Sequence, residues 1–199
     1  CTGGHIYIDD TDINDIEHGH LRENIGIVLQ EPFLYSRTIR ENIKITRPDA
    51  SDEEMFEAAK IASVHDVILS FDKGYDTLVG ERGVTLSGGQ QQRIAIARTL
   101  MKKTPILIFD DSMSAVDTET DTQIRDALHS IRGQCTTLII SHRITTLMES
   151  DRILVLDKGQ LIESGTHEFL LKEDGLYSRI ATIQEATGQF RRTSEGGEE

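Results

Sequence analysis

Three apolar runs of the sequence each end in polar side chains that could act together in a reaction. Gln30 follows the first run, the carboxylates Asp110 and Asp111 follow the second, and Ser141 and His142 follow the third. The runs cover residues 24–29, 106–109 and 136–140. Because the carboxyl ends of parallel strands line one edge of a sheet, we expect these polar groups to converge there.

The chemistry that such a set supports is phosphoryl transfer. An amide with carboxylates, here Gln30 with Asp110 and Asp111, can hold a hydrated Mg²⁺ through oxygen atoms. A carboxylate and an imidazole such as that of His142 can orient a water molecule in line with a terminal phosphate. Taken alone, each residue has a plainer interpretation, Gln30 as a polar strand end and His142 as a surface histidine. Together, the amide, the carboxylates and the imidazole favour phosphoryl transfer.

A glycine turn and a helix precede the second apolar run. Ser87 can cap the helix, because its side-chain oxygen can accept from the amides of the first turn. Gly88 and Gly89 carry no β-carbon, so an anion could approach those amides closely. The helix has a predicted buried face at helical spacing, formed by Ile94, Ala97 and Leu100 or Met101. The run at 106–109 does not alternate, which is typical of a central parallel strand covered on both faces.

The rest of the pattern mixes strands and helices and predicts an α/β fold. A strand is expected at His5–Asp9 with a turn after it, and a hairpin around Asp157–Gly159. Residues 33–101 are expected to form a mostly helical insertion between two strands of the sheet. Helices are predicted at residues 38–43, 51–61, 64–69, 118–131, 144–148, 166–172 and 175–186, with Ser51 and Thr166 as caps. Gly188–Glu199 has little to bury, which predicts a disordered tail.

The composition disfavours some classes of partner. The formal net charge is −13, from 21 basic and 34 acidic residues, and no basic stripe occurs. This charge argues against a nucleic-acid partner and against adsorption to an anionic membrane leaflet. The two cysteines, Cys1 and Cys135, imply no disulfide framework and fit a reducing compartment. No run of 18 apolar residues and no signal peptide is present in the sequence.

The stretch from Leu86 to Asp111 resembles a known family of ATPases. Leu86-Ser87-Gly88-Gly89-Gln90, a helix and an apolar strand ending in acid are similar to the signature motif and Walker B strand of the ATP-binding cassette (ABC) ATPases. The resemblance covers nearly the whole chain, with each motif once and in the family's order. It implies a RecA-like P-loop NTPase fold. The implied parts are an ATPase domain at 1–187, a helical signature subdomain at 33–101 and a tail at 188–199.

The resemblance also implies roles for individual residues. Gln30 matches the Q-loop glutamine, which in the family touches the metal or the attacking water. Asp110 matches the aspartate that holds Mg²⁺, Asp111 stands at the position of the general base, and His142 matches the switch histidine on the γ-phosphate. In the family, the signature covers ATP held by the other subunit, and the loop matched by Ser114–Asp117 crosses to that subunit. The residues implied at this shared ATP are Ser87, Gly88, Gly89, Gln90 and Asp117.

Other segments resemble the exporters of this family in particular. Phe33–Tyr35 and Thr38–Ile43 look like exporter sequence, and Gly80–Gly83 resembles the loop that contacts the coupling helices of the membrane domain. The resemblance implies an ATP- and Mg²⁺-dependent motor at the cytoplasmic face of a membrane. Its implied partners are a second ABC ATPase domain and transmembrane coupling helices, the latter at Gln30–Tyr35 and Gly80–Gly83.

Two alternative functions stay open. The first is a soluble ABC ATPase acting on DNA or in translation, which the acidic charge and the exporter-like Gly80–Gly83 disfavour. The second is a non-catalytic module that only dimerises in response to nucleotide. A hydrolysis assay on the complete subunit separates the second alternative from a working motor.

Two features depart from the family pattern. No Gly-x-x-x-x-Gly-Lys-Ser/Thr phosphate loop occurs, so we expect a C-terminal portion of a cassette whose isolated chain is inactive. Asp111 stands where the family normally has glutamate, and its side chain is one methylene shorter. This shortening predicts a slow, degenerate site in one half of a heterodimeric exporter. A homodimer in which Asp111 works slowly is the alternative.

Overall fold

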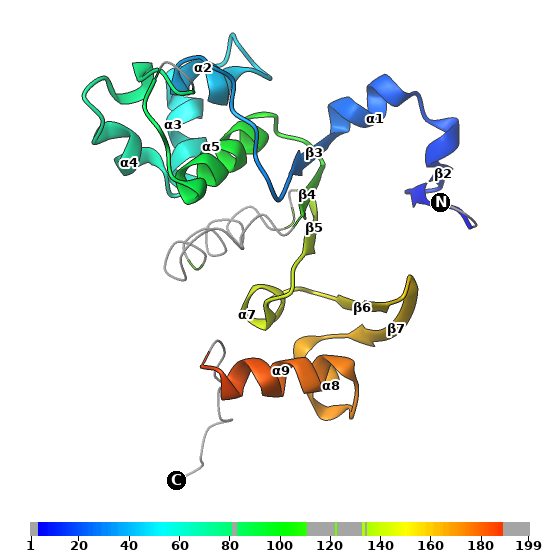
Figure 1. Ribbon diagram of the computed structural model, residues 1–199. Helices are drawn as coiled ribbons and strands as arrows, with labels where there is room; N and C mark the ends of the chain where they lie inside the picture. Colours follow the sequence, from blue (N-terminus) through cyan, green and yellow to red (C-terminus); the bar gives the residue numbers. More distant parts are fainter. Residues whose placement is uncertain (1–3, 81–82, 111–121, 123–132, 134, 189–199) are drawn as a thin grey trace. The chain divides into compact units, whose positions relative to one another are not determined.

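The computed structural model of the chain describes residues 4–80, 83–110, 122, 133 and 135–188 (Figure 1). The chain divides into two compact units, Cys1–Ile140 and Ser141–Glu199, each with its own hydrophobic core. None of the helices within the described residues is long and apolar enough to cross a membrane. The helix predicted at 118–131, apart from Thr122, and the predicted tail, apart from Gly188, lie outside the described residues.

The first unit contains a parallel sheet whose central strand is β4 (Ile106–Asp110). β4 pairs with β3 (Ile25–Val28) on one side and with β5 (Thr136–Ile140) on the other. All three strands lie where the sequence predicts strands, and their parallel pairing is confirmed. The register aligns Asp110 with Ile140, so β4 and β5 end together at one edge.

One face of this sheet forms part of the buried core. Val28, Leu107 and Phe109 are at most 3% exposed and cluster with apolar residues of helix α5 (Gly88–Met101). Leu138 of β5 is 48% exposed, and burial alternates along β4. Buried and half-buried residues alternate along β4, so the prediction that this strand is covered on both faces is confirmed for one face, and the other face is partly covered in the described residues.

The helices between β3 and β4 supply most of the remaining core of the first unit (Figure 1). They are α2 (Ile39–Lys44), α3 (Asp52–Ile61), α4 (His65–Leu69), the 3₁₀ turn η2 (Gly74–Asp76) and α5 (Gly88–Met101). The predicted helical character of this segment is confirmed. Its treatment as a separate subdomain at 33–101 stays a prediction.

Three of these helices begin with the same reciprocal cap. In each, the hydroxyl of the capping residue accepts from the backbone amide three residues on, and the side chain there accepts from the cap's own amide. The pairs are Thr38 with Glu41, Ser51 with Glu54, and Ser87 with Gln90. The predicted caps at Ser51 and Ser87 are confirmed.

The N-terminal residues form a hairpin in place of the single strand expected at His5–Asp9. β1 (Tyr7–Ile8) pairs antiparallel with β2 (Thr11–Asp12), so two of the predicted turn residues form the second arm. The hairpin closes because Asp9 adopts a left-handed conformation with φ 51°, which aspartate tolerates better than most residues. The 3₁₀ turn η1 (Ile13–Asp15) and helix α1 (His18–Asn24) follow.

In the residues that the structure describes, the second unit packs a hairpin and helices around a small hydrophobic core. Its elements are α7 (Ile144–Leu147), β6 (Ile153–Asp157), β7 (Gln160–Gly165), α8 (His167–Lys172) and α9 (Leu176–Ala186). The core residues are Ile144, Ile153, Leu170, Tyr177 and Ala181. The hairpin turns at Lys158 and Gly159, both with positive φ, as a tight two-residue turn requires. The predicted hairpin and the Thr166 cap are confirmed.

Glu54 on α3 gives the fold a specific dependence on pH. Its carboxylate accepts from Lys103 Nζ at 2.5 Å, from the Ser51 amide at 3.2 Å and from Arg47 Nη1 at 3.1 Å. These contacts, that of Lys103 foremost, lower the pKa of Glu54 from 4.5 to about 2. A lowered pKa in the folded state stabilises the fold above the unfolded pKa, and this stabilisation is lost as pH falls through the folded value.

We therefore expect Glu54→Gln to flatten the fall in stability between pH 4.5 and about pH 2. The measurement is the urea midpoint of the wild-type and variant chains across this range. Glu57→Gln is the matched control, because Glu57 lies on the same helix but pairs with Lys60 at an exposed surface. An acid limb of equal slope in Glu54→Gln and in the wild type would contradict the assignment.

Candidate functional site

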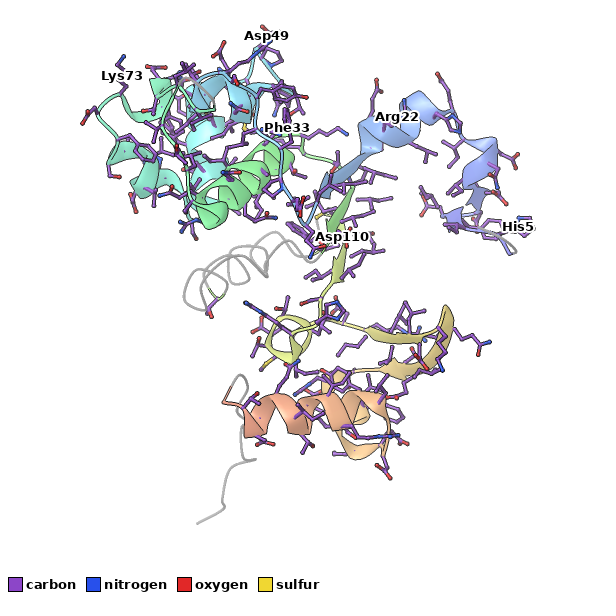
Figure 2. All side chains as sticks on the ribbon, in the orientation of Figure 1. His5, Arg22, Phe33, Asp49, Lys73 and Asp110 are labelled. Carbon is purple, nitrogen blue, oxygen red and sulfur yellow. The ribbon has the colours of Figure 1, made fainter. Side chains whose placement is uncertain are left out.

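Gln30 and Asp110 lie at the same edge of the parallel sheet. Asp110 is the last residue of β4, and the register aligns Val28 of β3 with Phe109 of β4. Gln30 lies two residues after Val28, just beyond the end of β3, and Asp110 lies one residue after Phe109. Gln30 is exposed, and Asp110, which is labelled in Figure 2, is half-buried. The structure thus brings two of the predicted site residues to adjacent strand ends.

His142, the other described residue that was predicted to be catalytic, belongs to the second unit. His142 is an exposed residue of the second unit, just before the N-cap of α7, and its carbonyl oxygen accepts from Gln184 Nε2 at 2.7 Å. β5, which precedes it in the sequence, ends opposite Asp110. Asp111 and Asp117 lie outside the described residues. The catalytic roles of these residues stay predictions.

The signature residues form the N-terminus of α5. Ser87 Oγ accepts from the Gln90 amide at 3.2 Å, and Gln90 Oε1 accepts from the Ser87 amide at 3.0 Å. Gly88 is exposed, and a β-carbon added there would meet no heavy atom within 4 Å. A helix N-terminus carries partial positive charge, so this end of α5 is open to an anion from outside the unit.

Sequence reasoning missed the polar side chains, buried Gln92 and half-buried Arg98, that join α5 to the segment around Gln30. Gln92 Nε2 donates to the Leu29 carbonyl at 3.1 Å. Arg98 Nη1 donates to the Phe33 carbonyl at 2.8 Å, and its Nε donates to the Asn42 carbonyl at 2.9 Å. Burial lowers the pKa of the Arg98 guanidinium. The available signal was a glutamine and an arginine set among the apolar residues of one helix, which is costly unless both are bonded.

A groove of about 380 Å³ brings together the two segments predicted to meet a membrane domain. Pro32, Phe33 and Leu34 form one wall, and residues around Gly80 form the other. Phe33 is 69% exposed and meets the Tyr35 ring edge-on at 5.0 Å between centroids. Exposed aromatic side chains at a groove are typical of an interaction surface. A larger cavity, of about 480 Å³, lies near Met101 and Thr104, at the start of β4 and away from Asp110.

The wall around Gly80 depends on glycine at Gly83. A β-carbon there would lie 2.1 Å from the Leu78 carbonyl oxygen, a backbone atom that cannot simply rotate away. We expect Gly83→Ala to lower the free energy of unfolding by about 1–3 kcal/mol, as for other forced overpacking. Thermal denaturation measures this, with Gly88→Ala as the control because the space there is open. Equal melting temperatures for the two variants would contradict the steric account.

The donor atoms at the sheet edge suit magnesium better than a transition metal. Gln30 and Asp110 offer amide and carboxylate oxygens, and Mg²⁺ prefers a few such oxygens with water and phosphate as further ligands. Among the described residues, no group of three His, Cys, Asp or Glu side chains is placed to hold a metal ion. The oxygen donors present therefore fit a Mg²⁺ ion bound together with a nucleotide.

Comparison with known proteins identifies relatives of most of the chain. A family model described as "ABC transporter" matches residues 1–114. The chain is 49% identical over 183 residues to a protein of Bacillus subtilis (strain 168) named "Putative multidrug export ATP-binding/permease protein YgaD". It is 47% identical over 183 residues to a protein of Staphylococcus aureus (strain NCTC 8325 / PS 47) with the same type of name. Each alignment covers 92% of this chain and 32% of the relative.

A solved structure is similar in fold as well as in sequence. It is described as the structure of a bacterial Atm1-family ABC exporter with ATP bound. The similarity has a TM-score of 0.87 and 47% sequence identity, over 92% of this chain and 32% of that one. The chain therefore spans about a third of the length of the relatives it matches.

Proposed function

Because the chain belongs to the ABC transporter family, we propose that it is part of the ATP-binding and ATP-hydrolysing motor domain of a membrane exporter. The observation that carries this proposal is the placement of Gln30 and Asp110 at one edge of a parallel sheet. The signature helix shares a hydrophobic core with that sheet. The names of the relatives, which describe export and ATP-binding proteins, support it. The compounds that are exported stay outside the proposal.

Asp110 and Gln30 would hold Mg²⁺ together with ATP. The ion would neutralise negative charge on the phosphates, which is the main electrostatic requirement of phosphoryl transfer. The protein's own contribution is to hold two oxygen donors at neighbouring strand ends, where both can reach one ion. His142 and Asp111 would orient the attacking water, as the family resemblance implies.

A second ABC ATPase domain is the proposed partner at the signature. The open N-terminus of α5, with Ser87 and Gly88 at its start, would face the phosphates of ATP held by that domain. Gly89, Gln90 and Asp117 would complete this contact. The charge of the helix end favours an anion there without any basic side chain, which is consistent with the acidic composition.

The groove between the segments at Pro32–Leu34 and Gly80 is the proposed contact for the coupling helices of a transmembrane domain. The exposed ring of Phe33 in this groove and the ring of Tyr35 beside it offer apolar area that a helix end could cover. In this arrangement the motor lies at the cytoplasmic face of a membrane. The contact segments, Gln30–Tyr35 and Gly80–Gly83, are those predicted from the sequence.

We further propose that the site built on Asp111 is the slow half of a heterodimer. The sequence favours this because aspartate replaces the expected glutamate, whereas the signature from Leu86 to Gln90 is intact. The signature would then complete the faster site on the partner. A homodimer that works slowly is the alternative, and the number of different subunits in the purified exporter distinguishes the two.

The isolated chain should bind nucleotide weakly. Its sequence contains no phosphate loop, so the main cradle of backbone amides and its lysine are missing from these 199 residues. Isothermal titration of the chain with Mg-ATP is expected to give a dissociation constant of about 1 mM or weaker, near the limit for a few exposed contacts. Binding in the low micromolar range would contradict this expectation.

The experiment that tests the proposed function is ATP hydrolysis by the complete subunit containing this chain, reconstituted in lipid vesicles. We expect phosphate release that depends on Mg²⁺ and exceeds the rate of empty vesicles. If the complete subunit neither hydrolyses nor binds Mg-ATP, the proposal is overturned.

A further inference from the structure

The segment that carries Gln30 is bonded at both ends to the signature helix. At one end, Gln92 Nε2 of α5 donates to the Leu29 carbonyl at 3.1 Å. At the other end, Arg98 Nη1 of α5 donates to the Phe33 carbonyl at 2.8 Å. Gln30, Glu31 and Pro32 lie between these two anchors, which belong to a single rigid helix.

Gln92 has a feature that stability alone does not explain. Its side chain is 0% exposed, and its Oε1 atom is buried without a hydrogen-bond partner in the part of the chain that the structure describes. A buried, unsatisfied amide oxygen is unfavourable, and an apolar side chain of the same length would avoid that cost. The favourable contact of the Gln92 amide is the bond from Nε2 to the Leu29 carbonyl, directly before Gln30.

Arg98 extends the same connection through Asn42. Its guanidinium donates to the Asn42 carbonyl and, from Nη2, to Asn42 Oδ1, both at 2.9 Å. Asn42 is fully buried, accepts from the Tyr35 amide at 2.9 Å and donates to the Tyr35 carbonyl at 2.9 Å. The guanidinium also lies 5.7 Å from the centroid of the Tyr35 ring. The backbone at Phe33 and Tyr35 is thus fixed to α5 by several bonds.

We propose that Gln92 and Arg98 are positioning residues that make the Leu29–Phe33 segment move together with the signature helix. Gln92 is five residues after Ser87, about 7.5 Å along the helix axis, so a displacement of the signature at the helix N-terminus reaches the Leu29 carbonyl with little loss. Nucleotide bound at the signature by a partner domain would then set the position of Gln30 in this domain's own site. This inference rests on the proposed function, because it needs nucleotide at both places.

The test uses the complete subunit in vesicles and a variant that removes only the donor. Gln92→Met keeps the length of the side chain, loses the bond to Leu29 and also removes the unsatisfied oxygen. We expect kcat for ATP to fall about 10-fold while the KM for ATP and the melting temperature stay close to wild type, since misplacement of a positioned group affects the reaction step. Gln92→Leu provides a second apolar variant if methionine lowers the melting temperature.

A double-mutant cycle with Gln30→Ala separates positioning from a general structural effect. If Gln92 acts through Gln30, then Gln92→Met causes no further loss of kcat once Gln30 is alanine, whereas independent effects would multiply. Thr99→Val is the matched control. Thr99 is buried on the same helix and bonds to the Ala95 carbonyl at 3.0 Å and the Ile27 carbonyl at 3.5 Å, without reaching the Gln30 segment, so kcat should not change.

Arg98→Lys tests the second anchor, because lysine keeps the charge but cannot reproduce three directed bonds. Hydrogen exchange of the backbone amides at residues 29–35 should rise in this variant and in Gln92→Met. Unchanged kcat in Gln92→Met, or losses that multiply in the double variant, would overturn the inference while the proposed function stands. Absence of hydrolysis by the wild-type subunit would instead overturn the proposed function, and this inference with it.

Discussion

Replacing Asp110 with asparagine is expected to lower kcat for ATP at this chain's own site by about 10²–10³-fold. The substitution keeps the shape of the side chain at the end of β4 but removes the negative charge that would hold Mg²⁺ at the sheet edge. Charge stabilisation by a bound metal contributes several kcal/mol to such reactions, and each 1.36 kcal/mol corresponds to about tenfold in rate. The measurement is steady-state phosphate release over a series of Mg²⁺ concentrations.

Asp157→Asn provides the matched control for this change. Asp157 also ends a strand, β6, but that strand belongs to the antiparallel hairpin of the second unit. Its substitution should leave kcat within about twofold of the wild type. Similar rates for the Asp110 variant and this control would show that the charge at the end of β4 has no part in hydrolysis.

Replacing Asp111 with glutamate is expected to raise the turnover of this chain's own site, by up to about 10²-fold. The added methylene moves the carboxylate by about 1 Å toward the position of the attacking water, and misplacement of this size can cost about 10²-fold in rate. The change tests the idea of a slow site, because a site that already works at full speed has nothing to gain. Turnover is measured at saturating ATP with the partner subunit present.

The control for the gain is Asp174→Glu, the same lengthening at a loop residue of the second unit between α8 and α9. It should have no effect on turnover. If Asp111→Glu gives no increase, or a decrease, then the rate of this site is limited by something other than the reach of its carboxylate. The proposal of a degenerate half would then have to be abandoned.

Much of the fold could be predicted because local signals agreed with the tertiary structure. The strands β3, β4 and β5 are rich in apolar residues, and the segment between β3 and β4 has caps such as Ser51 and Ser87 that fix helix starts. A hydroxyl residue three positions before Glu or Gln satisfies two backbone amides at once, so it identifies a helix N-terminus without knowledge of the rest of the chain. The parallel direction of the three strands was predicted from the polar side chains that follow each apolar run.

The distribution of burial was harder to predict. A short apolar run looks the same whether one or both faces are covered, and β4 proved to alternate in burial although its sequence does not alternate. The residue pattern predicts one strand where Tyr7–Asp12 form a hairpin, because the turn depends on the backbone conformation of Asp9. Such details arise from packing and from single dihedral angles, which the residue pattern does not encode.

Parts of the candidate site could be predicted from strand ends and from the helix cap at Ser87. Gln30 and Asp110 were found because strand ends in a parallel sheet share an edge. Gln92 and Arg98 were not, because their importance lies in bonds to the carbonyl oxygens of Leu29 and Phe33, far away in sequence. A buried glutamine on a helix resembles a surface one until its partners are known.

The most direct test of the account is the position of the metal in the nucleotide-bound exporter. Crystals of the complete protein grown with Mn²⁺ in place of Mg²⁺ and a non-hydrolysable ATP analogue would give an anomalous signal at the ion. We predict one peak beside the side chains of Gln30 and Asp110 and next to the triphosphate. A metal peak at the triphosphate with Gln30 and Asp110 both directed elsewhere would contradict the account.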